Sequence, residues 1–283
     1  MLSVSLKEKI KKLILYKNLY LRNIFIWIFL AFFSNSLMGQ AVKTVNFKKY
    51  FDEAGVNGCF VLYDQNNNIY VRYNTERCDS MYLPASTFKI PNSVIALEEK
   101  IVKSDTQTIK WDGTVWDRKE MNQDQDLRTA FKYSVIWVYF EFARKIGLEK
   151  YKEYLTSFDY GNKDLSGSPD KFWLDGGLRI SANQQVEFLK NFYSYRLNVF
   201  KSSIDVVKRL MVIEAPHDYK LSGKTGGGYL PDMKVIMWLV GYVEKAGNTY
   251  FYALNFTCDK YTAETGKLRL TILKNILKEL KVL

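Results

Sequence analysis

Histidine is almost absent from this 283-residue sequence, which contains only His217. A serine–histidine–aspartate mechanism would have to use that one imidazole, and a zinc site with several histidine ligands is excluded. We therefore expect no metal cofactor, and we expect any nucleophile in this chain to be activated by a group other than imidazole.

Proline and glycine are also scarce, with five and sixteen residues, which excludes a collagen-like or low-complexity chain. The sequence is 47% hydrophobic and 16% aromatic, so it can bury a large core and is not intrinsically disordered. Its length suits one large domain or two small ones.

A long apolar run is missing as well, because the apolar stretch at residues 24–33 has only about half of the roughly 20 residues that a bilayer span needs. Six Lys or Arg residues precede this stretch between positions 7 and 22, and small and polar residues follow it at 34–40. This order is typical of a secretory signal peptide. We predict a signal peptide at residues 1–39 and export to the periplasm, with no membrane attachment of the mature chain; the alternative is an uncleaved membrane anchor.

The formal net charge of +11 arises partly in this leader. Six of the 41 basic and one of the 30 acidic residues lie in residues 1–39, which leaves 35 against 29 in the rest. No basic run supports a nucleic-acid partner there, whereas a mild attraction for small anions fits the charge.

Three cysteines allow at most one disulfide within the chain. Cys59 and Cys78 flank a predicted hairpin, and export permits a bridge between them. The alternative is that these two and Cys258 are free thiols. The sequence assigns no oligomeric state.

Strand patterns occupy both ends of the chain and helix patterns the middle, which predicts a mixed α/β fold. We expect an antiparallel sheet flanked by helices, built from about 40–83 and 197–283, and an inserted helical part at about 84–196, within one domain at 40–283. A site is expected in the cleft between the two parts. The predicted strands are 58–64, 69–73, 234–244 and 249–257, and the predicted helices are 86–100, 131–146, 150–157, 181–193, 203–213 and 264–283.

The strongest local signal is Ser86-Thr87-Phe88-Lys89. Serine and lysine three residues apart share one face of a helical turn, and Pro84 favours a turn that places Ser86 at the start of a helix. Free N–H groups there favour a developing negative charge, and burial beside Phe88 would lower the pKa of Lys89. The structural alternative is a serine cap followed by a solvated lysine.

Two further motifs follow in order. Ser134 is predicted to start a helix, and Lys224-Thr225-Gly226 is predicted on an edge strand, where a hydroxyl and a cation could bind a carboxylate. A glycine at this point lets a ligand approach the backbone. Together, Ser-x-x-Lys, a second serine motif and Lys-Thr-Gly are typical of serine β-lactamases and penicillin-binding proteins.

The sequence resembles the class D β-lactamases, the oxacillinases, from about residue 47 to its end. The resemblance is carried by Ser134 and Gly223-Lys224-Thr225-Gly226, and by the segments PASTFKIPNS (84–93), YGN (160–162) and FWLDGGLRIS (172–181). The family's fold, an antiparallel sheet beside a helical domain, agrees with the predicted layout.

The resemblance implies that Ser86 is acylated by a β-lactam substrate and that Lys89 is carbamylated by CO2 to become an anionic general base. Trp173 would donate its indole N–H to that carbamate. These roles agree with elementary chemistry, because a carbamate needs a neutral, buried amine and a buried anion needs hydrogen-bond donors.

The resemblance also assigns roles to the second and third motifs. Ser134 would relay a proton to the leaving β-lactam nitrogen with the support of Lys224. Thr225 and Arg269, expected where the last helix opens, would hold the substrate carboxylate, and the N–H groups of Ser86 and Gly227 would form the oxyanion hole.

Three departures from the family pattern stand out, one of which is the short, polar loop from Tyr229 to Lys234. Ile136 stands where the family usually has valine, and Gly227 and Gly228 stand where it often has an aromatic residue. The main hypothesis is an exported serine β-lactamase that hydrolyses penicillin-type antibiotics. The alternatives are a penicillin-binding sensor domain that is acylated without hydrolysis, and a peptidoglycan D,D-peptidase. YGN is more readily interpreted as a structural turn, and His217 as a surface residue.

Overall fold

The computed structural model describes Glu8, Lys17 and residues 40–283. The predicted signal peptide, and the membrane anchor that is its alternative, therefore lie outside the described residues, apart from those two positions. The chain divides into two units, Met1–Ala41 and Val42–Leu283, and the description below concerns the second. None of the described helices is long and apolar enough to cross a membrane.

One seven-stranded sheet forms the centre of the fold, with the strand order β1-β3-β2-β9-β8-β7-β6. The pairs from β3 through to β6 are antiparallel. Both ends of the folded unit contribute to it, so the predicted fold class is confirmed. The strands are β1 (Ala41–Thr44), β2 (Asn57–Asp64), β3 (Ile69–Tyr73), β6 (Val212–Glu214), β7 (Lys220–Tyr229), β8 (Val235–Lys245) and β9 (Asn248–Cys258).

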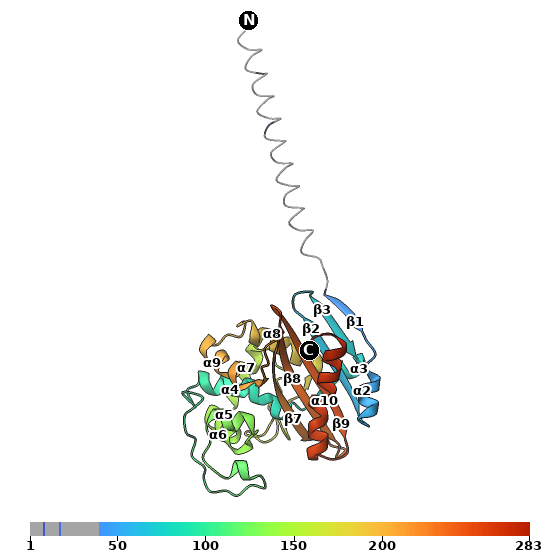
Figure 1. Ribbon diagram of the computed structural model, residues 1–283. Coiled ribbons are helices and arrows are strands. Elements are labelled where there is room, and N and C mark those ends of the chain that lie inside the picture. The colour runs from blue at the N-terminus through green and yellow to red at the C-terminus, as the bar shows by residue number, and fades with distance from the viewer. Residues whose placement is uncertain (1–7, 9–16, 18–39) are drawn as a thin grey trace. The chain divides into compact units, whose positions relative to one another are not determined.

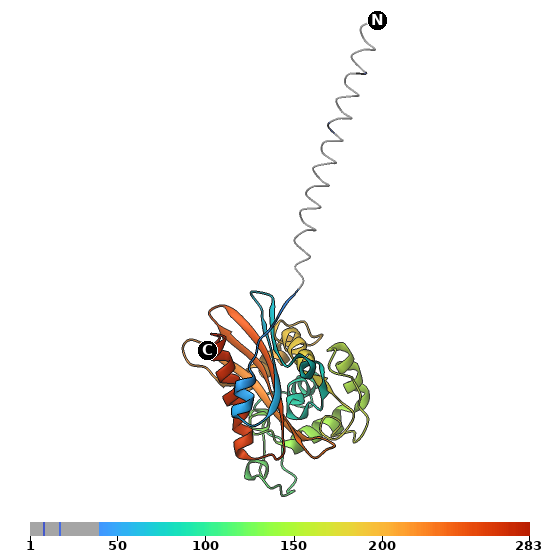
Figure 2. The same ribbon diagram turned by 90° about the vertical axis from the view of Figure 1, so that its right-hand side faces the viewer.

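The helices lie on both faces of the sheet (Figures 1 and 2). They are α2 (Lys48–Glu53), α3 (Thr75–Asp79), α4 (Lys89–Glu98), α5 (Leu127–Lys132), α6 (Ile136–Ile146), α7 (Leu148–Ser157), α8 (Ala182–Tyr193), α9 (Lys201–Leu210) and α10 (Ala263–Glu279), with two 3-10 turns, η1 (Ala85–Phe88) and η2 (Lys119–Met121). One face packs against α2 and α10 through side chains such as Phe51 and Leu273. The opposite face packs against α8 and, beyond it, the remaining helices.

The middle of β8 is buried on both faces, because helices cover both sides of the sheet. This explains why residues 234–244 form a nearly continuous apolar run rather than an alternating one. A second sheet of two short strands, β4 (Met81–Tyr82) and β5 (Ile180–Ser181), joins the segment before Ser86 to the start of α8. Ser181 caps α8 as predicted, since its Oγ accepts a hydrogen bond from the Gln184 N–H at 3.2 Å.

The structure differs from the expected elements at three places. The predicted helix 86–100 begins as the 3-10 turn η1 and only then becomes α4. The predicted helix 131–146 is divided into α5 and α6 by the segment 133–135, where Ser134 has a left-handed backbone (φ +52°). The predicted helix 203–213 ends at Leu210, and the edge strand β6 follows.

All three cysteines are free thiols, with Cys59 and Cys78 buried and Cys258 partly exposed. Cys78 lies next to β2 and β3 and donates to the carbonyl oxygen of Tyr73 at 3.1 Å. The structure thus agrees with the free-thiol alternative.

A side chain at Gly241 would disrupt the sheet beside the Lys-Thr-Gly motif. A Cβ there would lie 2.0 Å from the Ser222 carbonyl oxygen and 2.6 Å from the Gly223 Cα, both backbone atoms that cannot move away alone. We expect Gly241→Ala to lower the free energy of unfolding by about 2–3 kcal/mol, and Tm by roughly 4–12 °C, in thermal unfolding. Gly266→Ala is the control: it meets only the Arg269 guanidinium at 3.4 Å in α10 and should be neutral or stabilising. Equal Tm values for the two variants would show that the sheet tolerates a Cβ at position 241 and would contradict the prediction.

Candidate active site

The turn that carries Ser86 is fixed by hydrogen bonds on both sides. The Ala85 N–H donates to the Trp173 carbonyl oxygen at 3.1 Å. The Thr87 hydroxyl donates to the Pro84 carbonyl oxygen at 2.7 Å and accepts from the Gln185 side chain at 2.9 Å. Ser86 itself is half-buried at the N-terminal side of α4. Its hydroxyl therefore has a rigid support and an accessible side.

Lys89 is the first residue of α4, one turn after Ser86, and it is fully buried. Its Nζ has no hydrogen-bond partner and lies 4.3 Å from the centroid of the Tyr139 ring. Burial lowers the pKa of Lys89 well below its usual value, and the charges of Lys224 and Arg118 act in the same direction. Lys89 is thus a buried amine whose neutral form is favoured by its surroundings, and the alternative of a solvated lysine is wrong.

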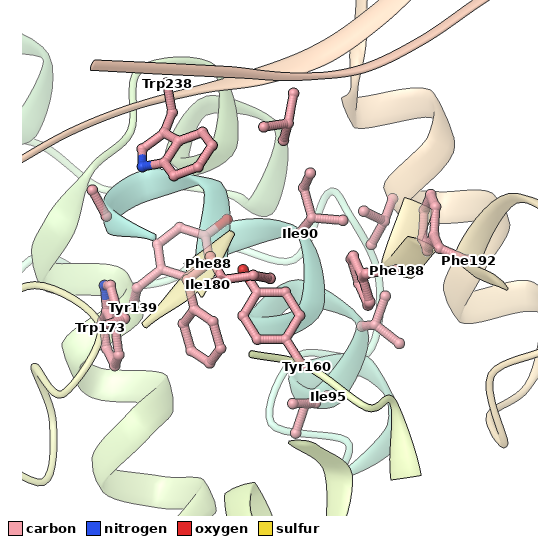
Figure 3. Close-up of a cluster of buried hydrophobic side chains, with 14 of the residues drawn as sticks. Phe88, Ile90, Ile95, Tyr139, Tyr160, Trp173, Ile180, Phe188, Phe192 and Trp238 are labelled. Atoms are coloured by element: carbon pink, nitrogen blue, oxygen red, sulfur yellow. The ribbon is translucent and has the colours of Figure 1, made fainter. Parts of the chain in front are cut away.

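Trp173 lies in the same aromatic cluster (Figure 3). Its ring stacks on Phe88 at 5.3 Å between centroids and is 6.1 Å from Phe140, the neighbour of Tyr139 on α6. The indole Nε1 is buried and, like the Lys89 Nζ, has no partner. Both nitrogen atoms are costly to leave unpaired in an apolar cluster, and the Trp173 indole N–H is a donor that fits an anionic group formed on the Lys89 amine.

Ser134 lies in the turn between α5 and α6, whereas the sequence pattern predicts it at the start of a helix. A left-handed conformation is unusual for a non-glycine residue and costs free energy. The Arg118 guanidinium donates to the carbonyl oxygens of Tyr133 and Ser134 at 2.7 and 3.3 Å, which stabilises this turn. The Ser134 hydroxyl points to β7 and accepts a hydrogen bond from the Lys224 Nζ at 2.5 Å.

Strand β7 brings the Lys-Thr-Gly motif directly against the Ser86 turn. A Cβ on Gly226 would lie 3.0 Å from the Pro84 carbonyl oxygen and 3.1 Å from the Thr87 side chain, so glycine permits this close approach. Lys224 is buried, and burial lowers its pKa to about 7, with further lowering by the charges of Arg269 and Arg118. Its ammonium also donates to the Thr225 carbonyl oxygen at 3.2 Å.

Arg269 reaches the site from α10, which packs on one face of the sheet. Its Nη1 donates to the Gly226 carbonyl oxygen at 2.8 Å and its Nε to the Gly266 carbonyl oxygen at 3.0 Å. The sequence pattern predicts this arginine where the last helix opens, but α10 begins at Ala263, so Arg269 lies in its second turn. The structure places Arg269 beside Lys-Thr-Gly, through its hydrogen bond to Gly226.

Tyr261 occupies the space beside Gly227. A Cβ on Gly227 would lie 2.5 Å from the Tyr261 ring, and that ring lies 6.0 Å from the Arg269 guanidinium carbon. The aromatic residue that is missing after Lys-Thr-Gly is thus replaced by one from the loop before α10. Neither Tyr261 nor Arg118 is predicted from the sequence, because neither belongs to a motif and both come from polar connecting segments.

The YGN segment forms a structural turn and His217 lies on the surface, in agreement with their interpretation from the sequence. Asn162 of YGN accepts from the Arg179 N–H at 2.9 Å and donates to the Gly177 carbonyl oxygen at 2.9 Å, which fastens the loop before β5. His217 is exposed and takes part in none of the contacts described above. Within the described part of the chain, no group of three or more His, Cys, Asp and Glu residues could hold a metal ion.

Comparisons with known proteins point to one family. Residues 39–278 match the family model described as the penicillin binding protein transpeptidase domain. The chain is similar to β-lactamase OXA-48 of Klebsiella pneumoniae, with 44% identity over 234 residues that cover 83% of this chain and 87% of the relative. A solved class D β-lactamase from Sebaldella termitidis is 37% identical with a TM-score of 0.83, covering 87% of this chain and 100% of the other.

A regulatory relative is also similar. The regulatory protein BlaR1 of Bacillus licheniformis is 37% identical over 236 residues, which cover 83% of this chain and 39% of BlaR1. This chain thus spans well under half of that protein.

Replacement of the buried Lys89 amine by an apolar group should stabilise the fold. Lys89→Met keeps a flexible apolar chain and removes an unpartnered buried nitrogen, so in CO2-free buffer at pH 7 we expect a gain of about 1–3 kcal/mol in the free energy of unfolding. Because the folded pKa is lowered, the unfolded chain binds more protons between that pKa and 10.5, so the parent protein gains stability as pH rises. The advantage of the variant should therefore shrink towards pH 10. The exposed Lys103→Met is the control, and a lower Tm of Lys89→Met at pH 7 would mean that the buried amine is not a cost to the fold.

Proposed function

Because this chain belongs to the class D serine β-lactamases, we propose that it hydrolyses the β-lactam amide of penicillin-type antibiotics through an acyl-enzyme on Ser86 and so gives resistance to them. The observation that carries the proposal is the pair of buried nitrogen atoms without partners, on Lys89 and Trp173, below the serine turn. An imidazole base is not needed, which agrees with the scarcity of histidine.

Ser86 is the proposed nucleophile. Its Oγ attacks the β-lactam carbonyl carbon, the C–N bond of the ring breaks, and the ester formed is later cleaved by water. Lys89, whose pKa is lowered by burial, provides the amine that CO2 carbamylates, and the carbamate supplies a carboxylate base within reach of Ser86. Trp173 donates its indole N–H to this anion, and the Tyr139 ring excludes water from it.

Ser134 and Lys224 are the proposed route of the proton to the leaving nitrogen. Their hydrogen bond of 2.5 Å already joins the two side chains. A pKa of about 7 allows Lys224 to give or take a proton near neutral pH, which is the property required of a proton relay. Arg118 acts through position, because it stabilises the strained Ser134 turn.

The substrate carboxylate is proposed to bind beside β7. Thr225 supplies a hydroxyl and Arg269 a guanidinium, and Lys224 adds a charge when protonated. The N–H groups of Ser86 and Gly227 are the proposed oxyanion hole, since Gly226 brings their two segments into contact. No metal takes part in this scheme. The mature enzyme is proposed to be exported to the periplasm after removal of residues 1–39.

A second candidate function is a penicillin-binding sensor domain, which is acylated but does not hydrolyse. The similarity to BlaR1 favours it, and the chemistry of acylation at Ser86 would be the same. The two functions differ in deacylation alone. Kinetics rather than labelling therefore separates them.

Turnover of a chromogenic cephalosporin by residues 40–283 tests the proposal. We expect many turnovers per enzyme, loss of all turnover in Ser86→Ala, and a fall of about 10²–10⁴ in kcat/KM in Lys89→Ala, because a general base is lost. Lys103→Ala is an exposed lysine control and should behave as the parent. One equivalent of stable acyl-enzyme with no turnover would reject hydrolysis and support the sensor function.

Carbamylation is tested without measuring activity. With 13C-labelled bicarbonate, we expect one carbamate carbon signal in the NMR spectrum of the parent protein and none in Lys89→Ala. The signal should be lost as pH falls through the lowered pKa of Lys89, since protonation of the amine releases CO2. Trp173→Phe should weaken the signal at limiting bicarbonate, whereas Trp111→Phe, whose indole donates to the Thr114 carbonyl oxygen at 2.8 Å, should not. Absence of the signal in the parent would remove this part of the mechanism.

A further inference from the structure

A cavity of about 650 Å³ adjoins the carboxylate-binding end of β7. Lys224 and Thr225 form one wall, α5 forms another, and the end of α9 with Met211 and the first residues of β6 forms a third. The cavity exists because β6 pairs only with Leu221 and Ser222, so the edge of β7 is left without a strand neighbour at Lys224 and Thr225. Ser86, Ser134 and Gly227 do not line it, so it is a separate compartment beside the reacting centre.

Basic side chains outnumber acidic ones in the lining of this cavity. Four are basic, Arg128, Lys132, Arg209 and Lys224, and one is acidic, Asp105. Asp105 is already engaged, because the Arg128 Nε donates to it at 2.9 Å. Among the described residues, Lys132 and Arg209 form no ion pair. The cavity therefore has an excess of positive charge, and it shares Lys224 and Thr225 with the proposed carboxylate site.

The position of the cavity along β7 indicates which part of a substrate would enter it. Gly226 and Gly228 lie beside the Ser86 turn, where the lactam carbonyl must react, whereas the cavity begins at Thr225 and extends the other way, to Gly223. In a cephalosporin, the ring carbon that bears the carboxylate is bonded directly to the carbon that bears the second substituent. A ring carboxylate bound at Thr225, which also lines the cavity, would therefore place that substituent close to the cavity.

We propose that this cavity is a subsite for a second anionic group of the substrate, carried on the substituent next to the ring carboxylate. The inference rests on the proposed β-lactam chemistry and adds to it a preference for dianionic cephalosporins. Arg209 and Lys132 attract the second anion, and Arg128 is held in place by Asp105. Because these side chains are exposed, the preference depends on ionic strength.

The test compares three cephalosporins that share one acyl side chain and differ only in an acidic, neutral or basic substituent at this position. We expect kcat/KM to be highest for the acidic compound and its advantage to shrink between about 0.05 and 0.5 M salt. Arg209→Gln should lower kcat/KM for the acidic compound by about two- to fivefold and leave the neutral compound unchanged. Arg209→Glu should shift the preference towards the basic compound. Arg196→Gln removes the same charge from an exposed position outside the cavity and is the control.

The outcomes separate this inference from the proposed function. Turnover of all three compounds at equal rates, or equal losses in Arg209→Gln and Arg196→Gln, would overturn the subsite while leaving hydrolysis intact. If the chain is acylated without turnover, the rates of acylation replace kcat/KM as the readout. A charge preference in those rates supports the subsite even where hydrolysis fails, and its absence rejects it.

Discussion

The burial of one amine is the constraint on which this site depends. Lys89 has no hydrogen-bond partner and lies against an aromatic ring, and its burial, together with the charges of Lys224 and Arg118, lowers its pKa well below the usual value. The aromatic cluster of Phe88, Trp173 and Tyr139 maintains that dryness. A protein gains nothing in stability from such an arrangement, since an unpaired buried nitrogen is costly. The cluster therefore serves the proposed chemistry of Lys89 rather than the stability of the fold. The large apolar core offsets its cost in free energy of folding.

The sheet contributes to the site by bringing distant segments of the chain together. Strand β7 reaches the Ser86 turn because Gly226 has no side chain, and this contact places Lys224 beside Ser134, 90 residues earlier in the chain. Arg269 then fastens the same strand from α10 by its bond to the Gly226 carbonyl oxygen. One glycine thus lets three segments meet at the candidate active site, and the cationic cavity lies where this strand loses its neighbour.

The sequence predicted the strands β2, β3, β8 and β9 and most of the helices, because these depend on local apolar patterns, and it singled out the motif residues by residue types at short spacing. The predictions from the sequence were wrong where tertiary contacts determine the backbone conformation. The turn at Ser134 interrupts a run whose apolar spacing predicts one helix, and it exists because Arg118, from a polar loop, stabilises an unfavourable conformation. Tyr261 and Arg209 were not predicted for the same reason. Their importance depends on residues that are distant in the sequence and close in the fold, and no local sequence pattern encodes such contacts.

Tyr261 fills the space beside Gly227, so the side-chain sizes allowed at these two positions, 34 residues apart, depend on each other. An aromatic residue after Lys-Thr-Gly, as the family often has, and a tyrosine at 261 would claim the same volume. A bulky residue at position 227 is therefore compatible only with a small residue at position 261, and the two positions must change together. Grafting the loops of a relative onto this scaffold would have to transfer both positions together, and mutational tolerance measured one residue at a time would underestimate which combinations the fold accepts.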